Sequence, residues 1–282
     1  MKFQKEINKY IDLALVEDIK DGDHTSLSTI PSSACGKAQL IIKDKGIIAG
    51  IEVAKAVAKK VDDKLIIDDF IKDGTAVDFG DIAFTIEGKS QSIVTAERLI
   101  LNCMQRMSGI ATQTHNYVKL IKHTNCKLLD TRKTTPNFRA FQKEAVHIGG
   151  GHNHRFGLYD MIMIKDNHVD FAGGIKEAIK ATRNYLKTQN LNLQVEIEIR
   201  NTQELVQALE YGQIDRIMLD NHSPEQITEA LKIIDGRFET EASGGITKET
   251  IVAYAETGVD FISVGALTHS AASLDMSLKA SN

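Results

Sequence analysis

The second half of the chain repeats a short apolar run followed by a helical pattern, and this alternation constrains the fold more than any other feature. The helical stretches, such as TQELVQALEYG and PEQITEALKIID, carry apolar residues three and four positions apart. The later repeats are about 22 residues long, which with the right-handed crossover rule favours a parallel, barrel-like sheet. Six runs end in polar or charged residues: KLLDTRK, DMIMIKDNH, LQVEIEIR, DRIMLDN, FETEASGG and DFISVGALTHS.

The same pattern sets the expected domains. Six strands leave little room for the eight βα units of a closed barrel, so we expect an open, incomplete α/β barrel over residues 110–269, with a doubly wound sheet as the alternative. Residues 1–109 combine β-branched alternation with Gly and Asp turns, which predicts a smaller α+β domain. The sequence TAERLILNCMQRMSGIATQTHNYVKLI begins within this domain and continues beyond residue 109, and it predicts a long helical connector. We expect the tail, 270–282, to pack on the first domain.

Composition excludes several classes of protein. The chain has 282 residues, 42% of them hydrophobic, and lacks the run of roughly 18 apolar residues that a membrane span needs. The N-terminal sequence MKFQKEINKYIDLALVED indicates a charged amphipathic helix rather than a signal peptide, so we expect a cytoplasmic protein. Three widely spaced cysteines are expected to be reduced thiols. A formal net charge of -4 gives no global attraction for nucleic acid or acidic lipid.

The chemistry is expected where the parallel strands end, because active sites of such barrels lie at that face. Arginine and lysine recognise carboxylate and phosphate oxygens, and SGG beside GAL offers backbone N–H groups to a phosphate, so the ligands should be anionic. Glu196 and Glu198 face the same side of one strand and Asp220 ends the next, which suggests binding of ribose hydroxyls or of a magnesium ion on a polyphosphate. The residues at this face are Arg132, Lys133, Lys165, Asp166, Glu198, Asp220, Ser243, Gly244 and Gly245.

Other interpretations of these residues remain. The basic segment 132–155 is typical of a solvated basic face as well as of a ligand site, although its position at strand ends favours the site. Its members are Arg132, Lys133, Arg139, Lys143 and Arg155, with His147, His152 and His154 and one acid, Glu144. His152 and His154 have the spacing of a zinc pair, but the nearby cations oppose a dication and no third ligand is evident. His168 and His222 are equally compatible with structural roles. The chain has no GxSxG elbow, P-loop or GxGxxG fingerprint.

The stretch DTRKTTPNFRAFQKEAVHIGGGHNHRFGLYDMIMIKDNH closely resembles the signature of the quinolinate phosphoribosyltransferase family. The likeness continues in the family's order through VEDIKDGDHTS, TAERLILNCMQRMSGIAT, VEIEIR, IMLDNHSPEQI, ASGGIT and GVDFISVGALTHS. It implies an N-terminal α/β sandwich joined to an open α/β barrel, and a role in NAD biosynthesis. One departure is Asn137, where the family commonly has glycine.

The resemblance also implies roles for individual residues. It places quinolinate against Arg98, Arg132, His154, Arg155 and Lys165. It places phosphoribosyl pyrophosphate and Mg²⁺ near Lys133, Glu198 and Asp220, with the 5-phosphate on Ser243, Gly244, Gly245, Gly265 and Ala266. Lys133 would stabilise departing pyrophosphate, and Glu198 and Asp220 would hold the ribose hydroxyls or the metal.

The assembly that the resemblance implies is a homodimer in which each small domain covers the partner's barrel, so that Arg98 acts in the partner's site. Further assembly into a hexamer stays open. Two rivals to the implied activity also stay open: a related phosphoribosyltransferase that uses another aromatic acid, and a non-catalytic scaffold that binds anions.

Overall fold

The computed structural model describes residues 1–281 and divides into two compact units. The first unit contains Met1–Asn116, Lys133–Gly151 and the described residues from Leu267 onward. The second contains Tyr117–Arg132 and His152–Ala266. Each unit is therefore assembled from separate stretches of the chain, and α4 (Ser90–Ile121) begins in the first and ends in the second.

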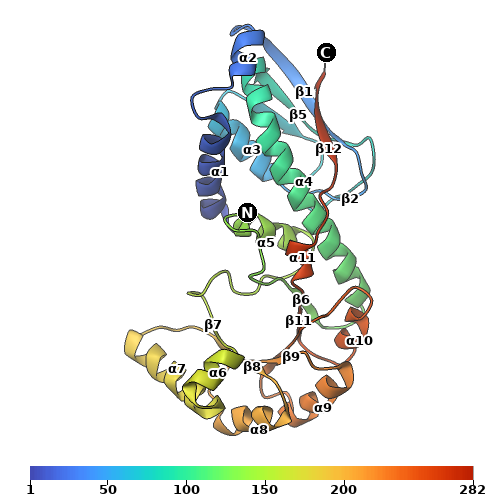
Figure 1. The fold of residues 1–282 in the computed structure, drawn as a ribbon. Helices are drawn as coiled ribbons and strands as arrows, with labels where there is room; N and C mark the ends of the chain where they lie inside the picture. The colour runs from blue at the N-terminus through green and yellow to red at the C-terminus, as the bar shows by residue number, and fades with distance from the viewer. Residues whose placement is uncertain (282) are drawn as a thin grey trace. The chain divides into compact units, whose positions relative to one another are not determined.

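The first unit is built on a four-stranded antiparallel sheet with the order β12-β1-β5-β3 (Figure 1). β1 buries alternate residues, including Leu40 and Ile42, as a strand with one covered face requires, whereas β5 buries four consecutive residues from Ala83 to Ile86. The last strand of the chain pairs with the first. The bounds are β1 (Cys35–Ile42), β3 (Ile66–Asp69), β5 (Ile82–Lys89) and β12 (Met276–Ser281), with a separate two-stranded pair β2 (Gly46–Ile47) and β4 (Ala76–Val77).

Helices complete the first unit. The predicted connector is the 32-residue helix α4, which buries Ile100, Met104 and Met107 four and three residues apart. The Ser108 hydroxyl bonds both backbone groups of Ala49, so α4 is joined to the chain that leads into α3. The other helices of this unit are α1 (Gln4–Ile19), α2 (His24–Thr29), α3 (Ile51–Val61), α5 (Arg139–Ile148) and, from its second residue, α11 (Ala266–His269).

The second unit contains the six predicted strands in one parallel sheet, ordered β6-β11-β10-β9-β8-β7. Its edge strands β6 and β7 do not pair with each other among the described residues, which confirms the open barrel. Helices α7, α8 and α9 lie along the outer side of the sheet (Figure 1). The strands are β6 (Lys127–Leu129), β7 (Ile162–Ile164), β8 (Val195–Ile199), β9 (Arg216–Asp220), β10 (Glu239–Ser243) and β11 (Phe261–Ser263); the helices are α6 (Asp166–Ala172), α7 (Ile175–Gln189), α8 (Thr202–Tyr211), α9 (Pro224–Ile234) and α10 (Ile251–Ala255).

Local sequence explains why the strands give way to helices at these points. The α8 helix begins after Asn201, whose side chain accepts a hydrogen bond from the Glu204 N–H. The α9 helix begins after Ser223 with a capping box completed by Gln226, and Pro224 occupies a first-turn position. No helix among residues 1–281 is both long and apolar enough to cross a membrane.

Candidate functional site

The C-terminal edge of the parallel sheet brings several predicted residues onto neighbouring strands. Asp220 is the last residue of β9 and Ser243 the last of β10, and the two are aligned in register. On the other side of β9 lies Glu198, the fourth residue of β8. Lys165 follows β7, and its Nζ lies 3.4 Å from Glu198 Oε2. One lysine and two carboxylates from three strands are thus gathered at this edge.

The carboxyl of Glu198 lies in an environment that changes its pKa. Burial raises the pKa of its carboxyl, Lys165 opposes the rise, and the negative charges of Asp220 and Asp166 add to it. Its side chain is 10% exposed, whereas that of Lys165 is 47% exposed. The carboxylate oxygens of Glu198 and Asp220 are the hard donors that Mg²⁺ prefers, and two carboxylates suit an ion that also binds a substrate's phosphates.

The turn after β10 needs glycine at Gly244. This residue has φ +94°, and an added Cβ would lie 2.3 Å from Asn221 Oδ1 and 2.8 Å from the Asn221 nitrogen. Asn221 itself donates a backbone hydrogen bond to the Ser243 carbonyl at 2.9 Å. Gly245, at φ +63°, has no atom within 4 Å of its Cβ position among the described residues, so a ligand can approach its backbone closely. Gly265 and Ala266, the other predicted phosphate residues, are half-buried just after β11.

The start of the basic segment is tied to β6. Leu129 bridges His152, and the buried Asp130 accepts hydrogen bonds from Asn153 Nδ2 at 2.7 Å and from the His154 N–H at 2.9 Å. Asp130 is 0% exposed and was not predicted as a site residue, although its place at the end of a predicted strand is the signal that could have found it. It fixes the segment that carries Arg155.

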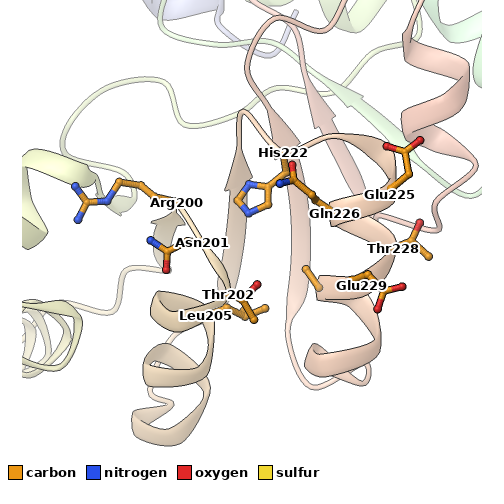
Figure 2. A pocket seen from close by; sticks show the side chains of 10 residues that line it. Arg200, Asn201, Thr202, Leu205, His222, Glu225, Gln226, Thr228 and Glu229 are labelled. Atoms are coloured by element: carbon orange, nitrogen blue, oxygen red, sulfur yellow. The ribbon is translucent and has the colours of Figure 1, made fainter.

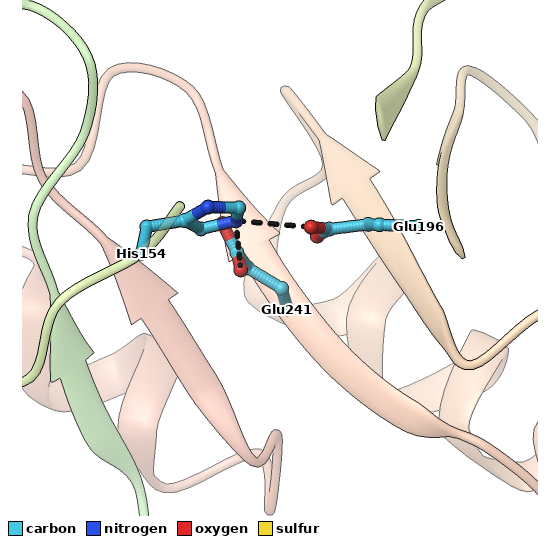
Figure 3. Close-up of side chains that lie close together, drawn as sticks. All are labelled: His154, Glu196 and Glu241. Atoms are coloured by element: carbon cyan, nitrogen blue, oxygen red, sulfur yellow. Dashed lines mark ion pairs between the residues drawn. The ribbon is translucent and has the colours of Figure 1, made fainter. Parts of the chain in front are cut away.

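His154 points into the second unit and meets two glutamates, as Figure 3 shows. Its Nε2 lies 2.9 Å from Glu196 Oε2 and 3.3 Å from Glu241 Oε2. The side chains are 4%, 0% and 0% exposed, respectively. Although burial lowers it, the two carboxylates raise the pKa of the His154 imidazole, and because Nδ1 accepts the Arg155 N–H, the ring proton lies on Nε2, facing the carboxylates. Burial and the charge of Glu241 raise the pKa of Glu196.

The structure places His152 and His154, the two histidines with the spacing of a zinc pair, in different surroundings. His154 faces Glu196 and Glu241, while the exposed His152 belongs to the bridge with β6. Among residues 1–281, His154, Glu196 and Glu241 are the group whose ligand atoms lie close enough together, within 4.8 Å, to hold a metal ion. Glu196 was expected from the sequence to share a strand face with Glu198, whereas Glu241, two residues before Ser243 on the equivalent face of β10, was not predicted.

Arg155 is half-buried beside this cluster. Its Nη1 donates to the Met161 carbonyl at 3.2 Å, and its Nη2 lies 3.7 Å from the Met163 sulfur. Burial lowers the pKa of its guanidinium, and the charge of Arg132 lowers it further. The two guanidinium groups therefore lie close enough to repel each other, an arrangement that an anionic ligand between them would favour.

The remaining predicted residues lie elsewhere. Arg98 is exposed on α4 and Lys133 is exposed after β6; both belong to the first unit. The Lys133 carbonyl accepts a hydrogen bond from the buried Thr268 hydroxyl at 2.8 Å. Lys143 is 0% exposed within α5, so the basic segment is not simply a solvated face. Asn137 has φ +61°, in the left-handed region that glycine and asparagine adopt most readily, so asparagine is tolerated here.

The two histidines at strand ends make local bonds. His168 Nδ1 accepts from the Lys165 N–H at 2.9 Å, and the buried His222 has its Nδ1 2.9 Å from the Asp220 carbonyl oxygen. His222 also lines a hollow between the first turns of α8 and α9, which Figure 2 shows together with Arg200 and Asn201. That hollow contains none of the predicted substrate residues.

Comparison with known proteins supports the resemblance over nearly the whole chain. Residues 23–108 match the family model for the N-terminal domain of quinolinate phosphoribosyl transferase, and residues 110–279 match that for its C-terminal domain. The chain is 45% identical over 289 residues to the chloroplastic nicotinate-nucleotide pyrophosphorylase (carboxylating) of Oryza sativa subsp. japonica, covering 97% of this chain and 77% of that protein. It is 40% identical over 273 residues to the probable nicotinate-nucleotide pyrophosphorylase (carboxylating) of Bacillus subtilis, covering 97% and 93%.

A solved structure is similar as well. The nicotinate-nucleotide pyrophosphorylase from Francisella tularensis superimposes with a TM-score of 0.90 at 41% sequence identity, covering 98% of this chain and 96% of that one. Both domains and both kinds of relative agree with the motifs and with the open barrel. The chain therefore belongs to the quinolinate phosphoribosyltransferase family.

Proposed function

We propose that the protein transfers the phosphoribosyl group of phosphoribosyl pyrophosphate to quinolinate and decarboxylates the product, giving nicotinate mononucleotide, pyrophosphate and CO₂. The observation that carries the proposal is the gathering of Lys165, Glu198, Asp220 and Ser243 at one edge of the parallel sheet in a chain that matches both family domains. Cations there suit a dianionic acid, and carboxylates suit a ribose.

The reaction needs positioning more than proton transfer. The pyridine nitrogen of quinolinate has a free lone pair, so it attacks the ribose C1 without prior deprotonation, while the bond from C1 to the pyrophosphate oxygen breaks. This agrees with the lack of a triad motif. The ring nitrogen then carries a positive charge, which stabilises the electron pair left on C2 when its carboxylate departs as CO₂. Solvent supplies the proton that C2 takes up.

Each part of the two substrates can be matched to residues of suitable charge. Arg132, Arg155 and Lys165 would bind the quinolinate carboxylates, since guanidinium and ammonium groups pair strongly with them. Lys133 would stabilise the departing pyrophosphate, and the turn at Ser243 to Gly245, with Gly265 and Ala266, would receive the 5-phosphate. Glu198 and Asp220 would hold Mg²⁺ or the ribose hydroxyls. Bound Mg²⁺ would neutralise charge that develops on the pyrophosphate.

The test is turnover by the purified protein. With quinolinate, phosphoribosyl pyrophosphate and Mg²⁺, we expect nicotinate mononucleotide and CO₂ in equal amounts. Nicotinate and nicotinamide serve as competing acceptors, because a related phosphoribosyltransferase with another substrate would prefer one of them. Preference for nicotinate, or equal turnover in EDTA, contradicts the proposal. Binding of quinolinate without pyrophosphate release would indicate a scaffold instead.

Two variants separate binding from chemistry. Arg155→Ala should raise the KM for quinolinate by the equivalent of about 2 to 4 kcal/mol, because a lost carboxylate contact affects ground and transition states alike. Lys133→Ala should lower kcat, if that lysine stabilises the leaving group. Lys176→Ala, an exposed substitution on α7, is the control and should change neither. An unchanged KM in Arg155→Ala contradicts its assignment.

The proposal includes a homodimer in which Arg98 of the partner subunit completes each site. Mixing Arg98→Ala with Lys133→Ala, each nearly inactive alone, tests this under conditions where subunits exchange. A mixed dimer would then have one doubly damaged site and one intact site, so random pairing should restore roughly a quarter of wild-type activity. If no activity returns although exchange is independently confirmed, Arg98 acts within its own chain.

A further inference from the structure

Two acidic side chains lie one layer beneath the edge that the proposed function uses. Glu196 precedes Glu198 by two residues on β8, and Glu241 precedes Ser243 by two residues on β10, so each shares the face of the residue above it. Both side chains are 0% exposed. Solvent reaches neither carboxylate in this structure, and the two meet at the His154 ring (Figure 3).

The two buried glutamates are expected to lower the stability of the folded protein. Burying carboxylates is unfavourable, and well-packed apolar side chains commonly give equal or greater stability than a buried ion pair. Glu196 Oε1, moreover, has no hydrogen-bond partner among the described residues. Stability alone is therefore a poor reason for two glutamates at this place, and a role in the site is the better one.

What the glutamates achieve is to fix His154. The ring is held at Nε2 by both carboxylates, and its Nδ1 accepts the Arg155 backbone N–H at 2.7 Å. The His154 N–H in turn donates to Asp130 at 2.9 Å. Ring and backbone are both held, so the path of the chain into Arg155 depends on these contacts.

Glu241 is itself held from the opposite side. Arg216 Nη1 lies 3.4 Å from Glu241 Oε2, and the same guanidinium pairs with Glu239 at 2.9 Å. Glu239 is on the same strand but exposed, and among the described residues no hydrogen bond or ion pair joins it to His154. The chain thus offers a matched glutamate that shares the arginine but not the histidine.

We infer that Glu196 and Glu241 are positioning residues for the aromatic-acid end of the site: they fix the His154 ring, and His154 fixes the turn from which the Arg155 guanidinium extends. In this arrangement Nε2 of His154 faces the two carboxylates and Nδ1 accepts the Arg155 N–H, so a displacement of the ring passes directly to Arg155. The inference rests on the proposed function for the identity of the acid.

The kinetic test uses Glu241→Gln and Glu196→Gln, with Glu239→Gln as the control. Because a misplacement of about 1 Å can cost 100-fold, we expect each buried variant to raise the KM for quinolinate roughly 10- to 100-fold. The KM for phosphoribosyl pyrophosphate should stay within about twofold, and Glu239→Gln should leave both values unchanged. An equal rise in both KM values overturns the inference.

A double-mutant cycle shows whether the effect passes through Arg155. In an Arg155→Ala background, Glu241→Gln should have no further effect on the KM for quinolinate, because the group that it positions is already absent. Effects that multiply in full would show that the glutamate acts independently of Arg155 and would overturn the inference. Glu196→Gln provides the same cycle if Glu241→Gln does not fold.

Two measurements do not depend on turnover. Hydrogen exchange at the Arg155 amide should accelerate in Glu241→Gln and not in Glu239→Gln, because the bond to His154 Nδ1 loosens; unchanged protection overturns the inference. Failure of the wild type to turn over quinolinate, with the exchange result as expected, would sink only the proposed function. A stoichiometric metal ion in the purified protein that is lost in Glu241→Gln would show a metal site instead of positioning.

Discussion

The hydroxyl of Ser108 makes two buried bonds to one residue, and its removal gives a sharply defined prediction. Ser108 Oγ accepts from the Ala49 N–H at 2.8 Å and donates to the Ala49 carbonyl at 3.1 Å. Both residues are 0% exposed, so water cannot replace the hydroxyl. The two bonds join the middle of α4 to the chain that enters α3.

Ser108→Ala should therefore be costly although it removes a single atom. Leaving a buried backbone donor or acceptor without its partner costs about 1 to 3 kcal/mol, so losing both bonds should lower the free energy of unfolding of the first unit by about 3 kcal/mol. The same free energy corresponds to roughly 100-fold faster exchange of the Ala49 amide hydrogen where local opening governs exchange.

Urea denaturation followed by circular dichroism gives the stability, and hydrogen exchange with mass spectrometry gives the local effect. The control is Ser92→Ala on the same helix, whose hydroxyl donates to Asp62 Oδ2 at 2.8 Å in a partly exposed place and should contribute less than about 1 kcal/mol. A loss below about 1 kcal/mol in Ser108→Ala, with unchanged exchange at Ala49, would refute this reasoning.

Three further predictions concern single groups. In the native protein a thiol reagent should modify Cys35 alone, because burial raises the pKa of the other two thiols to about 12; all three should react after unfolding, and fast modification of more than one native thiol contradicts this. Asp23→Ala should lower the free energy of unfolding by about 1 kcal/mol, since Asp23 caps α2 by accepting from the Ser26 N–H at 3.0 Å. Hydrogen bonds from Ser26 lower the pKa of Asp23, so its negative charge stabilises the folded protein at neutral pH. The wild type should therefore melt at a higher temperature than Asp23→Asn at neutral pH, and this difference should disappear as the pH falls below about 4. Gly109→Ala should lower the melting temperature and the exchange protection of β12, because its Cβ would lie 1.8 Å from the Ala272 carbonyl oxygen; a melting temperature like that of the wild type would show that this contact is not rigid.

The barrel strands could be predicted because their signal is local. In VEIEI, Val195, Ile197 and Ile199 are 0% exposed and alternate with acids, and both the apolar and the acidic residues belong to the same strand. Polar residues at the ends of such strands meet at one edge whatever the detailed packing. The predicted places of Glu198 and Asp220 therefore needed only the strand pattern and its parallel order.

The His154 cluster could not be predicted in the same way. Its glutamates are 42 and 87 residues away from the histidine in the sequence, and only the packing of β8 and β10 brings them to its ring. The family resemblance assigned His154 to the quinolinate site, but no sequence pattern indicated that its ring would face two buried glutamates. The sequence signal for the cluster is an acidic residue two positions before a predicted site residue. Glu196 precedes Glu198 in this way on β8, and Glu241 precedes Ser243 on β10.

These observations give the two faces of the parallel sheet different roles. The face toward the helices carries Ile197, Ile217, Leu219 and Ile262, each 0% exposed, and supplies the apolar burial that holds the unit together. The opposite face carries glutamates on β8 and β10 whose carboxyl groups are buried at a cost. Because side chains on a strand alternate, one residue can be replaced on the polar face without disturbing the apolar one. A family can therefore tune the charges of such an inner face for an anionic substrate while the face toward the helices keeps the fold.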